Sequence, residues 1–98
     1  MKDYEYPIDI QWTTNQMITV MDLWEALEQA YEKGISNQVF LEKYQAFKTV
    51  VKSIGEERRL GKDFELISGY SLYHTVKFAK ENKKALLKMK GGLHANLN

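Results

Sequence analysis

Apolar side chains recur at helical spacing along most of the chain, and this periodicity constrains the fold more than any other feature of the sequence. In the clearest stretch, Phe40, Tyr44, Phe47 and Val51 stand at positions i, i+4, i+7 and i+11, which places them on one face of a helix. Similar spacing joins the apolar residues within 17–31. The pattern predicts an all-α fold.

Capping residues and glycines divide this periodic sequence into about four predicted helices. Thr13 is followed three residues later by Gln16, the spacing of a capping box, so a first helix is expected from about 14 to 33. Gly34 then supplies a left-handed stop. By the same reasoning, a second helix is expected from Ser36 to about Lys52, a third from Ser53 to Gly69, and a fourth from Ser71 onward. Short connections favour roughly antiparallel neighbours in a small bundle.

The third predicted helix carries Leu60, Phe64 and Ile67 on its apolar side. Gly61 within it costs about 1 kcal/mol of helix propensity relative to alanine, which is consistent with a close helix crossing at this position. In the fourth helix, Leu72, Val76 and Ala79 continue the helical period.

The lysine-rich run "KFAKENKKALLKMK" is expected to prolong the fourth helix to about Lys90. Lysines late in a helix suit the negative C-terminal end of its dipole. Residues 91–98 are predicted to form a flexible tail. Residues 13–90 would then hold all the helices.

Residues 1–12 are predicted to form an extended arm. Tyr4, Tyr6, Ile8, Ile10 and Trp12 alternate with polar residues or with proline, which is a period of two. A lone strand is unstable, and no partner strand is evident, so the arm is expected to lie over the helices with its aromatic rings in their grooves. Residues 1–98 are therefore predicted to be one helical domain, a small bundle with an aromatic arm.

The composition argues against several classes of site and location. The chain has no cysteine and two histidines, so thiolate metal sites and disulfides are excluded, and neither a metal site nor a cofactor is expected. The N-terminal residues lack the apolar run of a signal peptide, and no stretch approaches about 18 apolar residues. We therefore expect a cytoplasmic protein that does not bind membranes.

The stretch "SGYSLYHT", residues 68–75, permits three interpretations. Gly69 and Ser71 match the first half of a nucleophile elbow, but a helix rather than a strand precedes them and Tyr73 replaces the second small residue. They also fit part of a helix-turn-helix pattern, although Glu65 and Thr75 depart from it. The favoured interpretation is a join between two helices, with Ser71 as a cap, and no catalytic residue is assigned.

Charge is divided unevenly along the chain. Residues 1–49 carry four lysines and eight acidic residues, a balance of −4, whereas residues 50–98 carry ten basic and five acidic residues, a balance of +5. If the fourth helix reaches Lys90, it would present a lysine face that could contact nucleic-acid phosphates or simply be solvated. The candidate contacts are Lys77, Lys80, Lys84 and Lys88.

Acidic residues on the first predicted helix also follow helical spacing. The row comprises Asp22, Glu25, Glu28 and Glu32, and we interpret it as a solvent-facing stripe. A hard cation or the basic fourth helix would be its alternative partners. In "EERR", residues 56–59, surface pairing is favoured, although the arginines could hold a phosphate or carboxylate.

Several stretches together resemble a known family. "YPIDIQWTT", "AYEKGI", "YQAFKTVVKSIGEERRL" and "FELISGYSLYHTVKFAK" are similar to the YktA-like uncharacterised protein family of low-GC Gram-positive bacteria, over residues 4–80. The resemblance implies an all-helical fold and transfers no catalytic residues. The family's recurrent features fall here on Tyr6, Pro7, Asp9, Trp12, Gly34, Glu57, Arg59, Gly69, Tyr70, Ser71 and Tyr73. Asp9, Glu57 and Arg59 lack an obvious role in the fold.

These observations favour a non-enzymatic protein that binds another protein or itself, since no reaction motif is present. Exposed aromatic residues often anchor protein interfaces, so three aromatic residues join Asp9, Glu57 and Arg59 as candidates. The candidate interaction residues are Asp9, Trp12, Glu57, Arg59, Tyr70 and Tyr73. The alternative is a nucleic-acid-binding module that uses the basic C-terminal helix.

Overall fold

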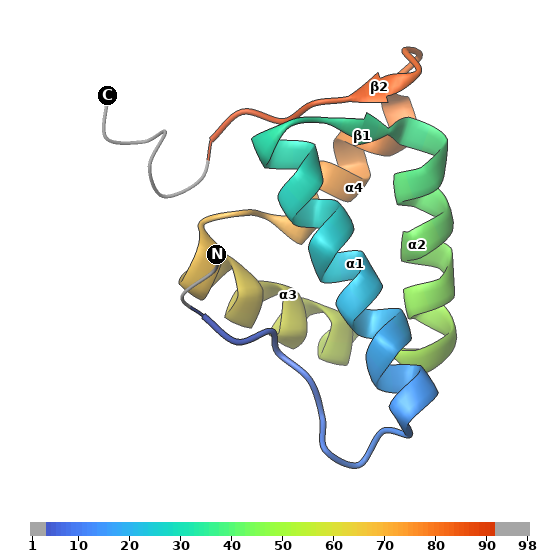
Figure 1. The fold of residues 1–98 in the computed structure, drawn as a ribbon, viewed down its shortest axis with the longest axis vertical. Helices are drawn as coiled ribbons and strands as arrows, with labels where there is room; N and C mark the ends of the chain where they lie inside the picture. Colours follow the sequence, from blue (N-terminus) through green and yellow to red (C-terminus); the bar gives the residue numbers. More distant parts are fainter. Residues whose placement is uncertain (1–3, 92–98) are drawn as a thin grey trace.

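The computed structural model describes residues 4–91 and shows four helices and a small two-stranded sheet (Figure 1). The elements are α1 (Thr14–Glu32), β1 (Ile35–Ser36), α2 (Asn37–Val50), α3 (Ile54–Ser68), α4 (Leu72–Glu81) and β2 (Leu86–Leu87). The predicted all-α class and the number of helices are confirmed. The predicted tail falls outside the described residues except for its first position.

The helix starts follow the capping signals in the sequence. Gln16 N donates to Thr13 Oγ1 (3.1 Å) and Thr13 N donates to Gln16 Oε1 (2.9 Å), so the predicted capping box is present. The other three helices each begin after a serine whose hydroxyl accepts from a backbone N–H of the first turn: Ser36, Ser53 and Ser71. Gly69 ends α3 at φ 82°, and Gly34 follows α1 at φ 94°.

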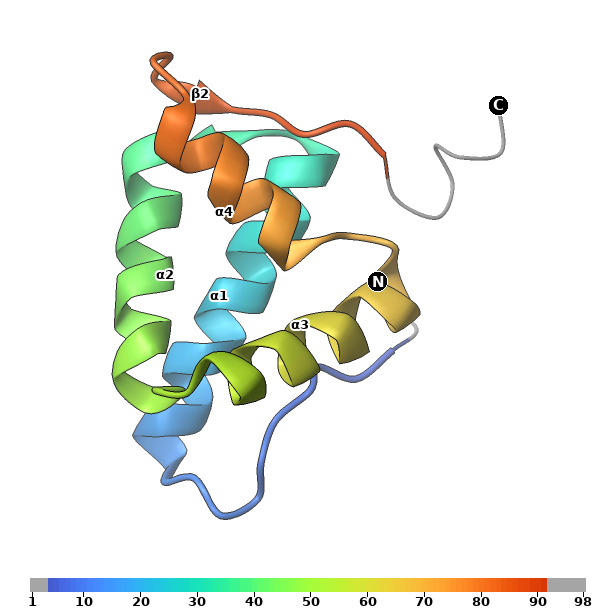
Figure 2. The ribbon, with the colours of Figure 1, turned by 180° about the vertical axis from the view of Figure 1, so that it is seen from behind.

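The first two helices lie antiparallel and side by side, and the other two cross one face of this pair (Figures 1 and 2). α3 crosses the pair near the start of α1, and α4 rises toward the sheet. Gly61 is buried in α3, and a Cβ added there would lie 3.4 Å from Leu72 Cβ. Gly61 therefore packs directly against the start of α4, and a Cβ at this position would make ordinary van der Waals contact with Leu72.

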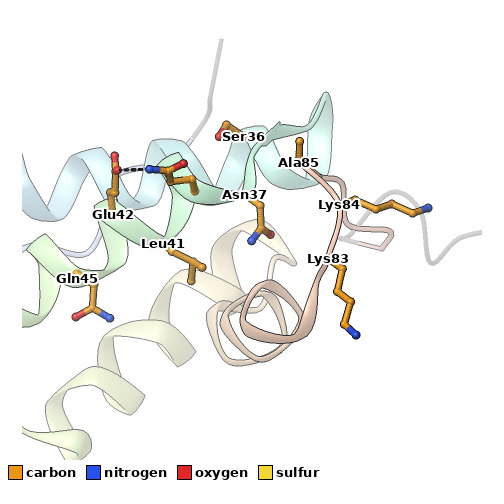
Figure 3. A pocket seen from close by; sticks show the side chains of 9 residues that line it. Ser36, Asn37, Leu41, Glu42, Gln45, Lys83, Lys84 and Ala85 are labelled. Carbon is orange, nitrogen blue, oxygen red and sulfur yellow. Dashed lines mark hydrogen bonds between the residues drawn. The ribbon is translucent and has the colours of Figure 1, made fainter.

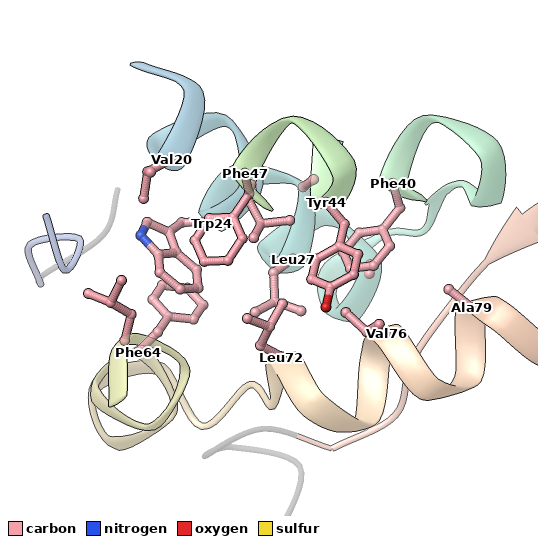
Figure 4. Packing of buried hydrophobic residues seen from close by; sticks show 14 of the residues in the cluster. Val20, Trp24, Leu27, Phe40, Tyr44, Phe47, Phe64, Leu72, Val76 and Ala79 are labelled. Atoms are coloured by element: carbon pink, nitrogen blue, oxygen red, sulfur yellow. The ribbon is translucent and has the colours of Figure 1, made fainter. Parts of the chain in front are cut away.

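The core lies between the helices and is rich in aromatic rings (Figure 4). Trp24 of α1 stacks on Phe64 of α3 with ring centroids 4.8 Å apart, and Phe47 of α2 meets Trp24 edge-on at 5.8 Å. The predicted apolar residues of α2 and α4 are buried as expected. The prediction for Ile67 is wrong: Ile67 is exposed, and Ser68 turns inward instead.

The predicted extension of the fourth helix to Lys90 is wrong. α4 ends at Glu81, and residues 82–91 turn back so that β2 pairs antiparallel with β1, with Ile35 opposite Leu87. Asn82 holds this turn: its Nδ2 donates to Asn37 Oδ1 and Leu86 O, and its Oδ1 accepts from Lys84 N. An asparagine side chain can form hydrogen bonds with nearby backbone groups in place of the helical ones. Asn82 therefore ends α4, although the lysines that follow are compatible with a helix.

The arm lies across α1 and α3 as predicted for its tyrosines. The rings of Tyr4 and Tyr6 contact Phe64, with centroids 5.9 and 6.1 Å away. Trp24 Nε1 donates to Pro7 O (2.9 Å), which fixes the middle of the arm. Ile8 and Ile10, which the period of two groups with the tyrosines, are exposed instead.

The pairing of β2 with β1 leads to a testable prediction about stability. Leu87 in β2 is fully buried, so Leu87→Ala should lower the free energy of unfolding by about 2–4 kcal/mol through lost burial and a residual cavity. Urea unfolding followed by tryptophan fluorescence measures this change. The matched control is Leu86→Ala, because Leu86 is its exposed neighbour and its truncation should cost about 0.5 kcal/mol or less. Equal effects of the two substitutions would contradict the strand.

Candidate functional site

The N-terminal candidate residues form a turn that leads into α1. Asp9 O accepts from Trp12 N (3.0 Å), and Asp9 Oδ1 accepts from Gln11 N (2.9 Å). The ring of Trp12 is half-buried against the core. Asp9 and Trp12 therefore have a structural role in this turn, which the sequence left open for Asp9.

Glu57 and Arg59 lie on the first half of α3 and have separate partners. Glu57 Oε2 accepts from Tyr44 Oη (2.7 Å), which ties α3 to α2. Burial, and then this hydrogen bond, raise the pKa of Tyr44 above its ordinary value. Arg59 lies 3.7 Å from Asp63 at an exposed position one turn along the helix. Such an exposed pair contributes little to stability.

Tyr70 and Tyr73 flank the start of α4 but differ in exposure. The ring of Tyr70 stacks on Tyr31 with centroids 4.6 Å apart, and its hydroxyl donates to Glu32 (2.8 Å). Tyr31 Oη in turn accepts from Ser71 N (3.2 Å). The side chain of Tyr73 is 69% exposed and packs edge-on against His74. Of these two tyrosines, only Tyr73 is open to a partner.

The acidic row on α1 is not the uniform solvent-facing stripe that the sequence indicates. Glu28 is only 6% exposed and accepts hydrogen bonds from Tyr4 Oη (2.5 Å) and Tyr6 Oη (2.7 Å). Burial and this bonding raise the pKa of both tyrosines above the ordinary value. Asp22 pairs with Lys43, and Glu25 is exposed. Sequence reasoning missed Glu28 because its partners lie more than twenty residues away.

The four lysines proposed to contact nucleic acid do not share one helical face. Lys77 and Lys80 lie on α4, whereas Lys84 lies in the turn after it and Lys88 follows β2. The predicted stripe is lost because α4 ends at Glu81. All four side chains are exposed, and the ion pairs found within residues 4–91 involve none of them.

Two lysines from different helices converge on one aromatic ring. Lys48 Nζ of α2 lies 5.3 Å from the centroid of the Tyr44 ring, and Lys80 Nζ of α4 lies 5.8 Å from it. These distances fall within the range of cation–π attraction. Lys48 has no ion-pair partner among the described residues either.

An open groove lies beside α2, between this helix and the turn that follows α4 (Figure 3). Its volume is about 790 Å³. The floor carries the half-buried side chain of Leu41, and Glu42 accepts from Gln38 Nε2 at 3.2 Å. The groove is lined by Ser36, Asn37, Gln38, Leu41, Glu42, Gln45, Lys83, Lys84 and Ala85. We call this feature, together with Lys48 and Lys80, the basic groove.

The sequence does not reveal the basic groove, because its lysine-rich run predicts that the fourth helix continues to about Lys90. Only the return of the chain at Asn82 brings Lys83 and Lys84 beside the start of α2. Asn37 secures this contact, since its N–H donates to Ala85 O (2.8 Å) and its Nδ2 donates to Ala79 O (3.1 Å). The Asn-Lys-Lys sequence was the available signal for a turn.

Residues 4–91 contain neither a cluster of metal-binding side chains nor a helix suited to cross a membrane. No three histidine, aspartate or glutamate side chains gather there as ligands for a metal ion. No helix of this region combines the length and apolar character needed to cross a membrane.

Comparison with known proteins places the chain in a family. The model of an uncharacterised protein family, UPF0223, matches residues 3–88. The chain belongs to UPF0223. A UPF0223 protein of Enterococcus faecalis is 56% identical over 89 residues, covering 91% of this chain and 97% of that protein. A UPF0223 protein of Lactococcus lactis is 47% identical over 83 residues, covering 85% and 89%.

A UPF0223 protein of Listeria monocytogenes is 47% identical over 87 residues and covers 89% of this chain and 97% of its own length. These relatives confirm the resemblance to an uncharacterised family of low-GC Gram-positive bacteria. The UPF0223 match ends at residue 88, so it includes β2 and the segment that closes the groove. The family description assigns no activity, and the function of the chain is not established by it.

The buried carboxyl group predicts a loss of stability on substitution. Glu28→Gln keeps the shape of the side chain but replaces one carboxylate oxygen with an amide NH2 group, which cannot accept from a tyrosine hydroxyl, and leaves a neutral acceptor for the other tyrosine. The free energy of unfolding should therefore fall by about 1–3 kcal/mol. Urea unfolding measures the change. Glu25→Gln, at an exposed site of the same helix, is the control and should change stability by about 0.5 kcal/mol or less. An unchanged Glu28→Gln variant would show that the tyrosine bonds contribute no net stability.

The raised pKa of Tyr70 predicts that the protein loses stability at alkaline pH. Burial, followed by the hydrogen bond to Glu32, raises the pKa of Tyr70 from 10.0 to about 12. The unfolded chain releases this proton first, so its contribution to stability is present below pH 10 and is lost as pH rises through 12. Urea unfolding at about pH 9 and about pH 11 should show a smaller loss for Tyr70→Phe than for the unsubstituted protein. Tyr73→Phe should lose as much as the unsubstituted protein.

Proposed function

We propose that this protein acts in the cytoplasm as a non-enzymatic binding module, and that the basic groove receives another protein. The observation that carries the proposal is an open groove with an apolar floor, bordered by exposed lysines that have no ionic partner within residues 4–91. Burial of Leu41 and pairing of the lysines would both be available to a protein ligand. Both kinds of contact recur at protein interfaces.

The polar groups of the groove support binding more than catalysis. Ser36 uses its hydroxyl to accept from Val39 N, and Glu42 is bonded by Gln38. Neither side chain is paired with a general base, an arrangement that activated nucleophiles require. Ser71, the serine of the elbow-like stretch, accepts from His74 N as the cap of α4.

Nucleic-acid binding by the same lysines is the second candidate, and the unpaired lysines of α4 and its following turn favour it. The ten-residue length of α4 weighs against it as a recognition helix, since only Lys77 and Lys80 of the four predicted contacts lie on it. Phosphate contacts from lysines would also make any such binding strongly dependent on salt.

Site-specific crosslinking tests the proposal. A photoreactive amino acid at Gln45, an exposed position in the groove, should capture a protein from native lysate. The same residue placed at Glu65, exposed on α3, is the matched control and should capture much less. The adduct at position 45 should survive nuclease treatment.

The other outcomes separate the candidates. An adduct at position 45 that contains nucleic acid would favour the second candidate. An adduct with the mass of two chains would identify the partner as a second copy of the protein. Equal capture at both positions, or none at either, would count against a binding role for the groove.

A further inference from the structure

The basic groove runs along one continuous face of α2. Gln38, Leu41, Gln45 and Lys48 follow one another at intervals of three or four residues, so they lie on successive turns of this face. Between Gln38 and Lys48 the helix rises about 15 Å, at about 1.5 Å per residue. An extended peptide covers that length with about five residues, at about 3.3 Å each.

Positive charge stands at both ends of this face. Lys83 and Lys84 lie where α2 begins, and their side chains extend outward from the turn (Figure 3). Lys48 lies near the other end. Lys80 follows Ala79, which accepts from Asn37 at the start of α2, and its ammonium group reaches the ring of Tyr44 between the two ends. Lysine is flexible, so each ammonium group can swing toward a ligand carboxylate without movement of the backbone.

The acidic groups near the face do not cancel these four lysines. Glu42 lies within the groove and Glu81 ends α4, and these two carboxylates offset only part of the charge of the four lysines. The carboxylate of Glu57 accepts a hydrogen bond from the hydroxyl of Tyr44. The face therefore retains an excess of positive charge, with Leu41 as an apolar site in the middle.

We propose that the partner offers an acidic segment of about five residues, which lies extended along α2 in the basic groove. Its carboxylates pair with Lys83 and Lys84 at the start of α2, with Lys80 beside Tyr44, and with Lys48 toward the other end. An apolar side chain between them covers Leu41. This inference rests on the proposed function and adds the chemistry of the ligand.

A peptide fits the face better than a single-stranded nucleic acid. Proteins that hold single strands stack the bases on exposed aromatic rings, with each base adding about 1–3 kcal/mol. Tyr44, the aromatic residue beside this face, is buried and its hydroxyl donates to Glu57, so its ring offers no exposed stacking surface. Amide side chains such as Gln38 and Gln45 suit the backbone groups of a peptide.

Fluorescence polarisation with defined probes tests this inference. The probe is a fluorescein-labelled peptide in which glutamates and aspartates flank one leucine, compared with the same peptide carrying asparagine and glutamine at the acidic positions. The acidic peptide should bind at least about tenfold more tightly at low salt, and raising the salt should reduce that difference.

The variants localise the binding. Lys83→Glu with Lys84→Glu should weaken binding by about tenfold or more, and Lys48→Gln with Lys80→Gln by about threefold or more. Arg58→Glu with Lys62→Glu is the matched control, because both side chains are exposed on α3 and the change in net charge equals that of the first variant. This control should bind the probe nearly as well as the unsubstituted protein. Circular dichroism verifies that each variant is folded.

Three results would overturn the inference. One is equal binding of the acidic and neutral peptides, and another is equal weakening by the groove and control variants. The third is tighter, groove-dependent binding of a labelled single-stranded oligonucleotide than of the peptide. If the peptide fails while crosslinking at position 45 still captures a protein, the acidic ligand is wrong and the proposed function stands.

Discussion

The stack of Trp24 on Phe64 is the contact on which the rest of the structure depends. Trp24 is fully buried, and its ring meets α3 on one side and Phe47 of α2 on another. Its indole N–H donates to Pro7 O, so the same residue also holds the arm. One side chain therefore joins three helices and the N-terminal segment, and aromatic residues supply the large buried area that so small a core requires.

Tyrosine–carboxyl pairs orient the elements that surround this stack. Glu28 receives the two tyrosines of the arm, Glu32 receives Tyr70 from the join between α3 and α4, and Glu57 receives Tyr44 of α2. Such bonds are directional, whereas apolar packing fixes separation more than orientation. Three acidic residues that could have faced a partner are thus used inside the molecule, while several lysines remain exposed. This imbalance is why the basic groove, rather than the acidic half of the chain, is the surface that we propose for binding.

The candidate site could be predicted from the sequence only in its components. Ser36 and Ser71 were recognisable as caps, and the lysines after Val76 were recognisable as a basic segment. Their arrangement was not, because the predicted helix to Lys90 placed Lys84 and Lys88 on a face with Lys77. The sequence favours Tyr70 as a contact residue, yet its ring stacks on Tyr31 and its hydroxyl donates to Glu32, so both groups are engaged within the molecule.

The sequence by itself determined the number of helices, their starts and most of the buried face of each. These features depend on local chemistry: a hydroxyl that caps a nearby N–H, a glycine that adopts positive φ, and a period of 3.6 residues. The tertiary structure alone decided that Glu28 is buried, that Ile67 gives way to Ser68, and that the chain after Glu81 returns to pair with β1. The burial of Glu28 and the pairing of β2 depend on partners between about twenty and fifty residues distant, and a periodic pattern carries no information about which distant group will satisfy a carboxyl or a strand.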